Sequence, residues 1–174
     1  MSNNWYMLTL IGEDKPGIVA SVSKALFEHG LNLGETSMLR LGGNFTIMMM
    51  VSGVHGEADL RDRLKPVIEA LGMCLHVDPI QAHLHEHLLP NIQVTVSGAD
   101  RAGIVAQVTA ALAAAGFNIL DLESDVAGTQ QKPVYIMQIA GVAEVPVEAI
   151  ERALEPLRLD GVDVNVNAVE TYIG

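Results

Sequence analysis

Short apolar segments recur along the chain between glycine-rich turns, and their periodicity predicts a regular succession of strands and helices. Tyr6–Ile11 and Ile92–Val96 are rich in β-branched or bulky residues, which is typical of strands. Each is followed by a segment in which apolar residues recur every four positions, Ile18–Phe27 and Ile104–Leu112. That spacing predicts an amphipathic helix after each of the two strands.

Two further strands, a second helix and a final strand follow in each half of the chain. A glycine closes each first helix, and the paired Gly42-Gly43 suits a hairpin turn. Pro146 suits the first turn of its helix, whereas Pro66 and Pro156 are expected to kink or shorten theirs. Gly30 and Gly116 are the predicted helix stops, and a longer loop is expected inside the second hairpin. The remaining predicted elements are the strand pairs Asn32–Leu41 with Asn44–Val51 and Asn118–Val126 with Val134–Ala140, helices at about 57–71 and 146–157, and final strands Met73–Val77 and Val162–Val169.

The halves are two copies of one unit. GEDKPGIV at 12–19 matches GADRAGIV at 98–105, and the ungapped match extends over 12–35 and 98–121. A repeat of this kind fixes the architecture. The order βαββαβ, twice, predicts an α+β fold of two ferredoxin-like units, each an antiparallel four-stranded sheet with helices on one face. We expect domains at 1–80 and 91–174 with a linker at 81–90.

One strand of the first copy is unusual in its composition. The segment FTIMMMV at 45–51 is apolar at almost every position, so both of its faces are apolar. We therefore expect a second sheet, a helix or another protomer to cover the sheet face turned away from the helices.

The charge of the chain narrows the possible functions. The net charge is −11, and Asp and Glu outnumber Lys and Arg by 21 to 10. Nucleic-acid binding relies on basic side chains that neutralise phosphates, so direct binding is not expected. The longest basic grouping, Arg61, Arg63 and Lys65 around Asp62, is typical of a solvated helix face. Any effect on a gene is expected to act through another protein.

Other classes of protein are disfavoured on composition. Cys74 is the only cysteine, so an intramolecular disulfide or a thiolate metal cluster is not expected. The first residues lack a basic flank and a long apolar run, and no apolar stretch approaches the length of a membrane helix. We expect a cytoplasmic protein that neither enters nor binds a membrane.

The repeated turn is the candidate site for chemistry. Asp14 and Asp100 suit helix N-caps, and Pro16 suits the first turn of a helix. Gly17 and Gly103 are costly in a first turn, so they indicate either a special backbone angle or close approach by a ligand. The free amides at a helix start favour a carboxylate. A purely structural turn remains the alternative.

Asn32 and Asn118 each open a strand after the glycine that ends a helix. An Asn amide both donates and accepts hydrogen bonds, so it can bind an amino group and a carboxylate together. The alternative is that these side chains satisfy backbone groups of the turn.

The D-x-P-G-I-V turn, the amphipathic helix, the G-x-N step and the βαββαβ order resemble the ACT domain, a small amino-acid-sensing module. Two such units filling the chain, with GEDKPGIV and HGLNL in the first, resemble the glycine cleavage system transcriptional repressor family. The resemblance implies a ligand site where the turn of one unit meets a neighbouring unit. The implied ligand-binding residues are Asp14, Lys15, Pro16, Gly17, Ile18 and Asn32 in the first copy and Asp100, Arg101, Gly103, Ile104 and Asn118 in the second.

The second copy departs from the pattern at Ala102, where the motif has proline. Its site is therefore expected to be looser, to bind another ligand or to be structural only, and the first site is preferred. The resemblance also implies a homo-oligomer that binds glycine or serine and acts through a DNA-binding activator protein.

Three rival readings stay open. An enzyme is disfavoured because the sequence lacks the nucleophile elbow, the phosphate-binding loop and the dinucleotide fingerprint, and no cofactor is expected. A metal site is conceivable at His83, His85 and His87, which alternate and would share one face of an extended strand. The third reading is an assembly module without ligand sensing, or a regulatory subunit of an amino-acid metabolic enzyme.

Overall fold

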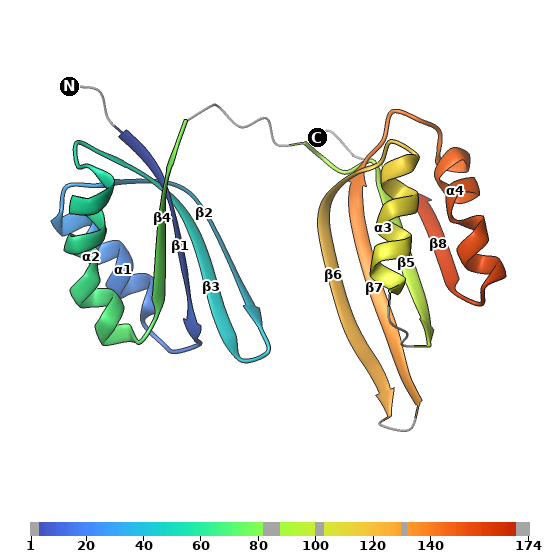
Figure 1. Cartoon of the computed structure of the whole chain (residues 1–174), viewed down its shortest axis with the longest axis horizontal. Helices are drawn as coiled ribbons and strands as arrows, with labels where there is room; N and C mark the ends of the chain where they lie inside the picture. The colour runs from blue at the N-terminus through green and yellow to red at the C-terminus, as the bar shows by residue number, and fades with distance from the viewer. Residues whose placement is uncertain (1–3, 82–87, 100–102, 130–131, 170–174) are drawn as a thin grey trace. The chain divides into compact units, whose positions relative to one another are not determined.

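The computed structural model describes residues 4–81, 88–99, 103–129 and 132–169. The chain divides into two compact units, Met1–Leu84 and His85–Gly174, called unit 1 and unit 2 below. Both units have the element order βαββαβ, and in each of them two helices cover one face of a sheet (Figure 1).

Unit 1 is built on an antiparallel sheet with the strand order β2-β3-β1-β4. The turn between β2 and β3 is Gly42-Gly43, and both residues have positive φ, as a tight hairpin requires. The elements of unit 1 are β1 (Asn4–Glu13), α1 (Ile18–Glu28), β2 (Asn32–Leu41), β3 (Asn44–Gly53), α2 (Glu57–Leu71) and β4 (Cys74–Ile80).

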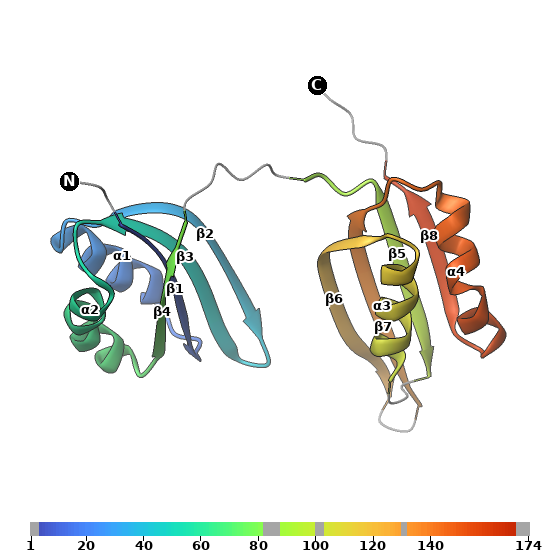
Figure 2. The same ribbon diagram turned by 45° about the horizontal axis from the view of Figure 1, so that its top comes forward.

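Unit 2 repeats this arrangement with the strand order β6-β7-β5-β8, which is also antiparallel (Figure 2). Its elements are β5 (Ile92–Ala99), α3 (Ile104–Ala114), β6 (Asn118–Thr129), β7 (Lys132–Val142), α4 (Val147–Leu159) and β8 (Asp163–Ala168).

Each core lies between the sheet and its two helices. Side chains alternate across a strand, so Leu8 and Leu10 of β1 point to the helices while their neighbours point away. They pack in one cluster with Val22 of α1 and Leu64 of α2. Unit 2 builds its own cluster from the equivalent rows. The predicted ferredoxin-like α+β fold is confirmed in both units.

The predicted elements appear in the predicted order, but several of their ends differ. Pro66 and Pro156 do not shorten their helices, which run on to Leu71 and Leu159. Pro146 is the N-cap residue of α4, outside its first turn.

The second hairpin is also longer than predicted. Strands β6 and β7 remain paired as far as Thr129 and Lys132, so only two residues separate them, not the longer loop expected from the sequence. The precise boundaries 1–80, 81–90 and 91–174 stay a prediction.

The solvent-facing side of α2 carries the basic group noted in the sequence. Arg61 pairs with Glu57 at 2.9 Å and Arg63 with Asp59 at 2.8 Å, each one helical turn away. This confirms a solvated, ion-paired helix face. Among the described helices, none combines the length and apolar character needed to cross a membrane.

Candidate functional site

The turn between β1 and α1 is held against the hairpin of β2 and β3. The backbone amide of Asp14 donates to the carbonyl oxygen of Gly43 at 3.2 Å. The carboxylate of Asp14 accepts from the guanidinium of Arg40, with Nη2 2.8 Å from Oδ2. Residues far apart in sequence therefore fix the position of this turn before helix α1 begins.

The prediction that Asp14 caps α1 is wrong. Its carboxylate is paired with Arg40, and the N-cap residue of α1 is Gly17, which has no side chain to cap the helix. Pro16 lies in the turn before the helix and not in its first turn. The helix starts at Ile18, whose side chain is buried.

Gly17 has a φ of 90°, and the equivalent Gly103 has a φ of 88°. A Cβ added at either position would meet nothing within 4 Å, so the backbone angle and not crowding within the unit accounts for glycine. The first hydrogen bond of α1 runs from the amide of Ser21 to the carbonyl of Gly17 at 2.9 Å. The amides of Ile18, Val19 and Ala20 therefore have no acceptor within the helix.

Lys15 points its ammonium group to Glu13, with Nζ 3.1 Å from Oε2. Both side chains are largely exposed, so this pair contributes little to stability. Lys15 lies near the helix start, so a ligand carboxylate could replace Glu13 as its partner at little cost in free energy.

The second turn differs from the first in its anchoring. Asp100 and Arg101 lie outside the described residues, whereas Gly103 and the buried Ile104 occupy the positions of Gly17 and Ile18. The register places Val126 of β6 where β2 has Arg40, because Val126 pairs with Tyr135 as Arg40 pairs with Phe45. Unit 2 thus lacks the arginine that fixes the first turn.

Asn32 and Asn118 begin β2 and β6, and both are exposed. Within the described part of the chain, neither side chain makes a hydrogen bond. Asn91 behaves differently, since its side chain donates to the carbonyl of Ala143 at 2.8 Å and accepts from the amide of Ala143 at 3.1 Å. The structure therefore gives Asn32 and Asn118 no role in satisfying their own turns.

Unit 1 does not bring its predicted site residues together. Asn32 pairs with Ser52, level with Trp5 at one end of the sheet, while the turn after Gly12 lies at the other end. Helix α1 spans this distance with 11 residues, which is roughly 16 Å at the usual rise. The residues 14–18 and Asn32 form two separate groups within unit 1.

A second polar cluster lies near the Asn32 end. The His55 ring places Nδ1 2.6 Å from Oδ2 of Asp59 and Nε2 3.0 Å from the carbonyl oxygen of His29. It therefore links the C-terminal end of α1 to the first turn of α2. The hydrogen bond from Arg63 lowers the pKa of Asp59 despite the opposing effect of desolvation, and His55 lowers that pKa further.

Sequence reasoning missed both Arg40 and His55. The four-residue spacing of His55 and Asp59 was a detectable signal for a contact at a helix start. Arg40 had no such signal, because its contact with Asp14 depends on the β2-β3-β1 strand order.

The predicted metal ligands lie outside the residues that the structure describes. His83, His85 and His87 all fall in the range 82–87, which the structure does not describe. Across the described ranges, no group of three or more His, Cys, Asp or Glu side chains is arranged to hold a metal ion.

Each unit is thus a ferredoxin-like domain with an exposed helix start at the end of its first strand. Comparison with protein families matches an ACT domain over residues 6–88 and another over residues 92–158. The chain belongs to the ACT-domain family and carries two such domains in tandem.

Similarity to individual proteins extends over nearly the whole chain. It is 26% identical over 161 residues to the glycine cleavage system transcriptional repressor of Escherichia coli, covering 90% of this chain and 85% of that protein. A crystal structure of an unknown protein from Galdieria sulphuraria has a TM-score of 0.73 and 26% identity, covering 97% of this chain and all of that one. A crystal structure of a candidate glycine cleavage system transcriptional repressor has a TM-score of 0.72 at 17% identity, covering 98% and 100%, and supports the fold alone.

Proposed function

We propose that the protein is a non-enzymatic, cytoplasmic regulator that binds a small amino acid and controls a partner protein. The observation that carries this proposal is that unit 1 exposes two groups without hydrogen-bond partners, the amides at the start of α1 and the side chain of Asn32. The amides suit the carboxylate of an amino acid, and the Asn32 amide suits its amino group.

The distance between these two groups determines which units would contact the ligand. Since about 16 Å of helix divides them in one unit, a ligand smaller than that is contacted by the turn of one unit and the Asn of another. Binding at such a seam favours one packing of units over others, which changes the surface that a partner meets. A homo-oligomer, or a pairing of units, is part of this proposal.

The first turn is the preferred ligand site. Its Asp14 donates its backbone amide to Gly43 and pairs with Arg40, so the start of α1 is positioned before a ligand arrives. Unit 2 has Val126 at the position of Arg40 and Ala102 where the motif has proline. Similarity to a glycine cleavage system transcriptional repressor supports a regulatory role. Glycine or serine as ligand and a DNA-binding activator as partner are further parts of this proposal. The net charge of −11 supports action through that protein.

The test is a thermal-shift screen of the full chain against the twenty amino acids. A ligand at about 100 times its dissociation constant should add roughly 2.7 kcal/mol of stability. Asn32→Ala should abolish most of the shift for the active ligand, because it removes the group that binds the amine. Asn165→Ala, at an exposed asparagine of β8 away from both turns, is the control and should keep the shift.

The Asn118→Ala variant distinguishes the contribution of unit 2 from that of unit 1. Retention of the shift in Asn118→Ala with loss in Asn32→Ala would assign the amine contact to Asn32, and the reverse result would contradict that assignment. No shift with any amino acid at millimolar concentration would contradict ligand sensing, and an equal shift in wild type and Asn32→Ala would contradict the assigned site.

A further inference from the structure

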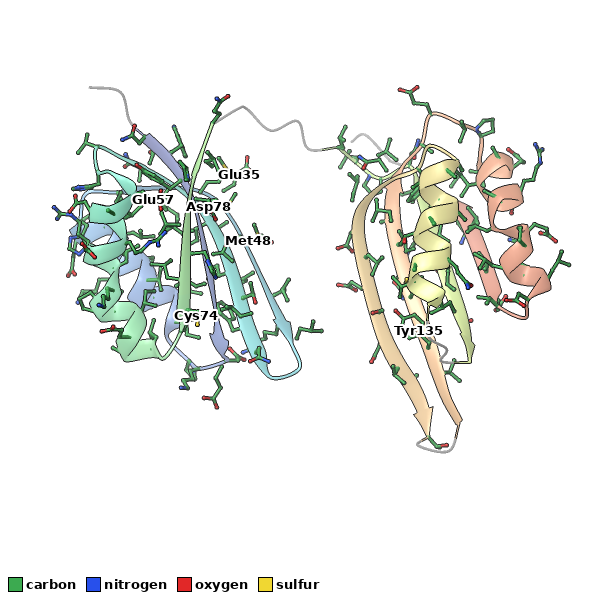
Figure 3. The ribbon with its side chains drawn as sticks, viewed as in Figure 1. Glu35, Met48, Glu57, Cys74, Asp78 and Tyr135 are labelled. Carbon is green, nitrogen blue, oxygen red and sulfur yellow. The ribbon has the colours of Figure 1, made fainter. Side chains whose placement is uncertain are left out.

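The ring of His55 lies between two hydrogen-bond acceptors in unit 1. Its Nδ1 is 2.6 Å from Oδ2 of Asp59, in the first turn of α2, and its Nε2 is 3.0 Å from the backbone carbonyl oxygen of His29, at the end of α1. Glu57, the first residue of α2, is labelled in Figure 3 and pairs with Arg61 at 2.9 Å. We call the His29 carbonyl, the His55 ring and the Asp59 carboxylate the His55 bridge.

Both partners of the ring can only accept a hydrogen bond. A carbonyl oxygen has no proton, and the Asp59 carboxylate is ionised near neutral pH because the hydrogen bond from Arg63 lowers its pKa. A neutral imidazole donates from one ring nitrogen and presents a lone pair at the other, whereas an imidazolium donates from both. A neutral ring would therefore turn a lone pair towards one of the two acceptors. The doubly protonated ring is the form that fits both contacts.

The charges near the ring favour this form on balance. The Asp59 carboxylate is a full negative charge in direct contact, and the end of α1 adds the partial negative charge of its dipole. Partial burial of the ring, which is 18% exposed, and the positive end of α2 act against the proton. A full charge at 2.6 Å outweighs a partial charge of about half a unit. Glu28, in the last turn of α1, pairs with Lys24 at 3.7 Å.

Other titratable or charged residues reach His55 from α2, α1 and β1. Arg63 donates to the second oxygen of Asp59 at 2.8 Å, and it is the cation that acts against protonation of the ring. Tyr6 of β1 donates its hydroxyl to the His55 carbonyl oxygen at 2.9 Å. Histidine is the residue type here that ordinarily titrates near neutral pH, so His55 and the neighbouring His29 are the two groups that an experiment must distinguish.

Unit 2 shows that the fold does not require this arrangement. Val145 precedes the N-cap of α4 as His55 precedes the N-cap of α2. The third residue of α4 is Ala149, where α2 has Asp59. The His55 bridge is therefore a feature of unit 1 that the matching positions of unit 2 lack.

The bridge lies beside the segment that leads into β2. A Cβ added at Gly53 would meet Leu31 at 2.6 Å and His55 at 3.8 Å, so these two side chains lie close to the same point of β3. Leu31 is buried, and Asn32 follows it. We propose that protonation of the His55 ring links the end of α1 to the start of α2, so that the segment 29–32 is held more firmly at acidic than at alkaline pH. The proposal does not rest on amino-acid binding, but it makes the position of Asn32 depend on pH.

The experiment measures amide hydrogen exchange of the full chain by NMR at about pH 6 and about pH 8, on either side of the range in which histidine ordinarily titrates, with each rate divided by the intrinsic rate at that pH. The Leu31 amide donates to the carbonyl of Leu26 at 3.0 Å, so its protection reports on this segment. Its protection should fall roughly tenfold between the two pH values, the usual size of one hydrogen bond to a charged group. The Phe117 amide makes the same bond to Leu112 in unit 2, also at 3.0 Å, and should keep its protection.

Three variants assign the effect to the bridge. His55→Gln cannot take up a proton, so the protection of Leu31 should be low and equal at both pH values. Asp59→Asn should also lose the pH dependence, because the carboxylate that favours the proton is gone. His29→Gln keeps the backbone carbonyl that accepts from the ring, and it should behave as the wild type.

The comparison of Leu31 with Phe117 in the wild type needs no substitution, so it stands even where a variant does not fold. Equal protection of Leu31 at both pH values would overturn the proposal. An equal fall at Phe117, or a fall at Leu31 that persists in His55→Gln or disappears in His29→Gln, would overturn it as well.

Discussion

Gly17 is the residue on which the start of α1 depends. Its φ of 90° belongs to the left-handed region, and no other atom of the unit crowds it. The sequence raised two reasons for glycine here, and the structure supports the backbone angle. The repeat of the same angle at Gly103 shows that the angle belongs to the turn itself.

Replacing Gly17 by alanine should lower the free energy of unfolding by about 1–2 kcal/mol, the usual cost of a left-handed non-glycine residue. Gly56 is the matched control, because it is the N-cap of α2 but has a φ of −79° and open space around it. Gly56→Ala should cost less, about 0.5 kcal/mol, because alanine is a poorer N-cap than glycine but its φ at this position is not strained. Urea denaturation measures both, and equal effects would contradict the argument from the angle.

Asp59 makes part of the stability of unit 1 depend on pH. Hydrogen bonding from Arg63, with His55, holds its pKa below the ordinary value of 3.8. A carboxylate with a depressed folded-state pKa contributes stability above its unfolded pKa and loses it as pH falls through the folded pKa. Asp59→Asn should therefore be less stable than wild type at pH 7, and the difference should shrink below about pH 4.

Urea denaturation at a series of pH values tests this. The control is Asp62→Asn, which removes a carboxylate of the same helix that forms no ion pair within the described residues. Its difference from wild type should vary much less between pH 7 and pH 3. A constant difference for Asp59→Asn over that range would contradict the assigned role.

At the scale of elements, hydrophobic periodicity was sufficient to predict type and order. The alternation in β1 and the four-residue spacing in α1 both reflect burial against one core, so they are visible in the sequence. Strand β2 was predicted with its observed bounds, Asn32–Leu41, although every residue of it is exposed, because the glycines before and after it mark its ends. The strands of the second hairpin were predicted too short because pairing continues through Gly128 and Pro133, which are residue types that sequence analysis assigns to turns.

Pro66 interrupts the hydrogen bonds of α2 without ending the helix, since α2 continues to Leu71. It is exposed, so core packing does not compensate for the missing amide. Pro66→Ala should raise the free energy of unfolding by about 1–3 kcal/mol, measured by urea denaturation. Pro156→Ala, at the matching place in α4, should act in the same direction. Loss of stability in both would mean that the proline geometry itself is needed.

For the whole molecule, the sequence repeat predicted two equivalent units, and the described structure confirms this. The candidate site was less predictable. Asp14, Gly17 and Asn32 could be selected by residue type, but their separation by the length of α1 and the anchoring by Arg40 follow only from the strand order. The duplication also concealed a difference, because the inner rows of the sheets match while the outer rows do not.

That difference gives the two copies different surfaces. On the sheet side away from the helices, unit 1 carries Met7, Leu39 and Met48 where unit 2 carries Gln93, Asp125 and Gln138. The duplicated fold constrains only the row of side chains that each sheet buries against its helices, so the opposite row is free to differ between the two copies.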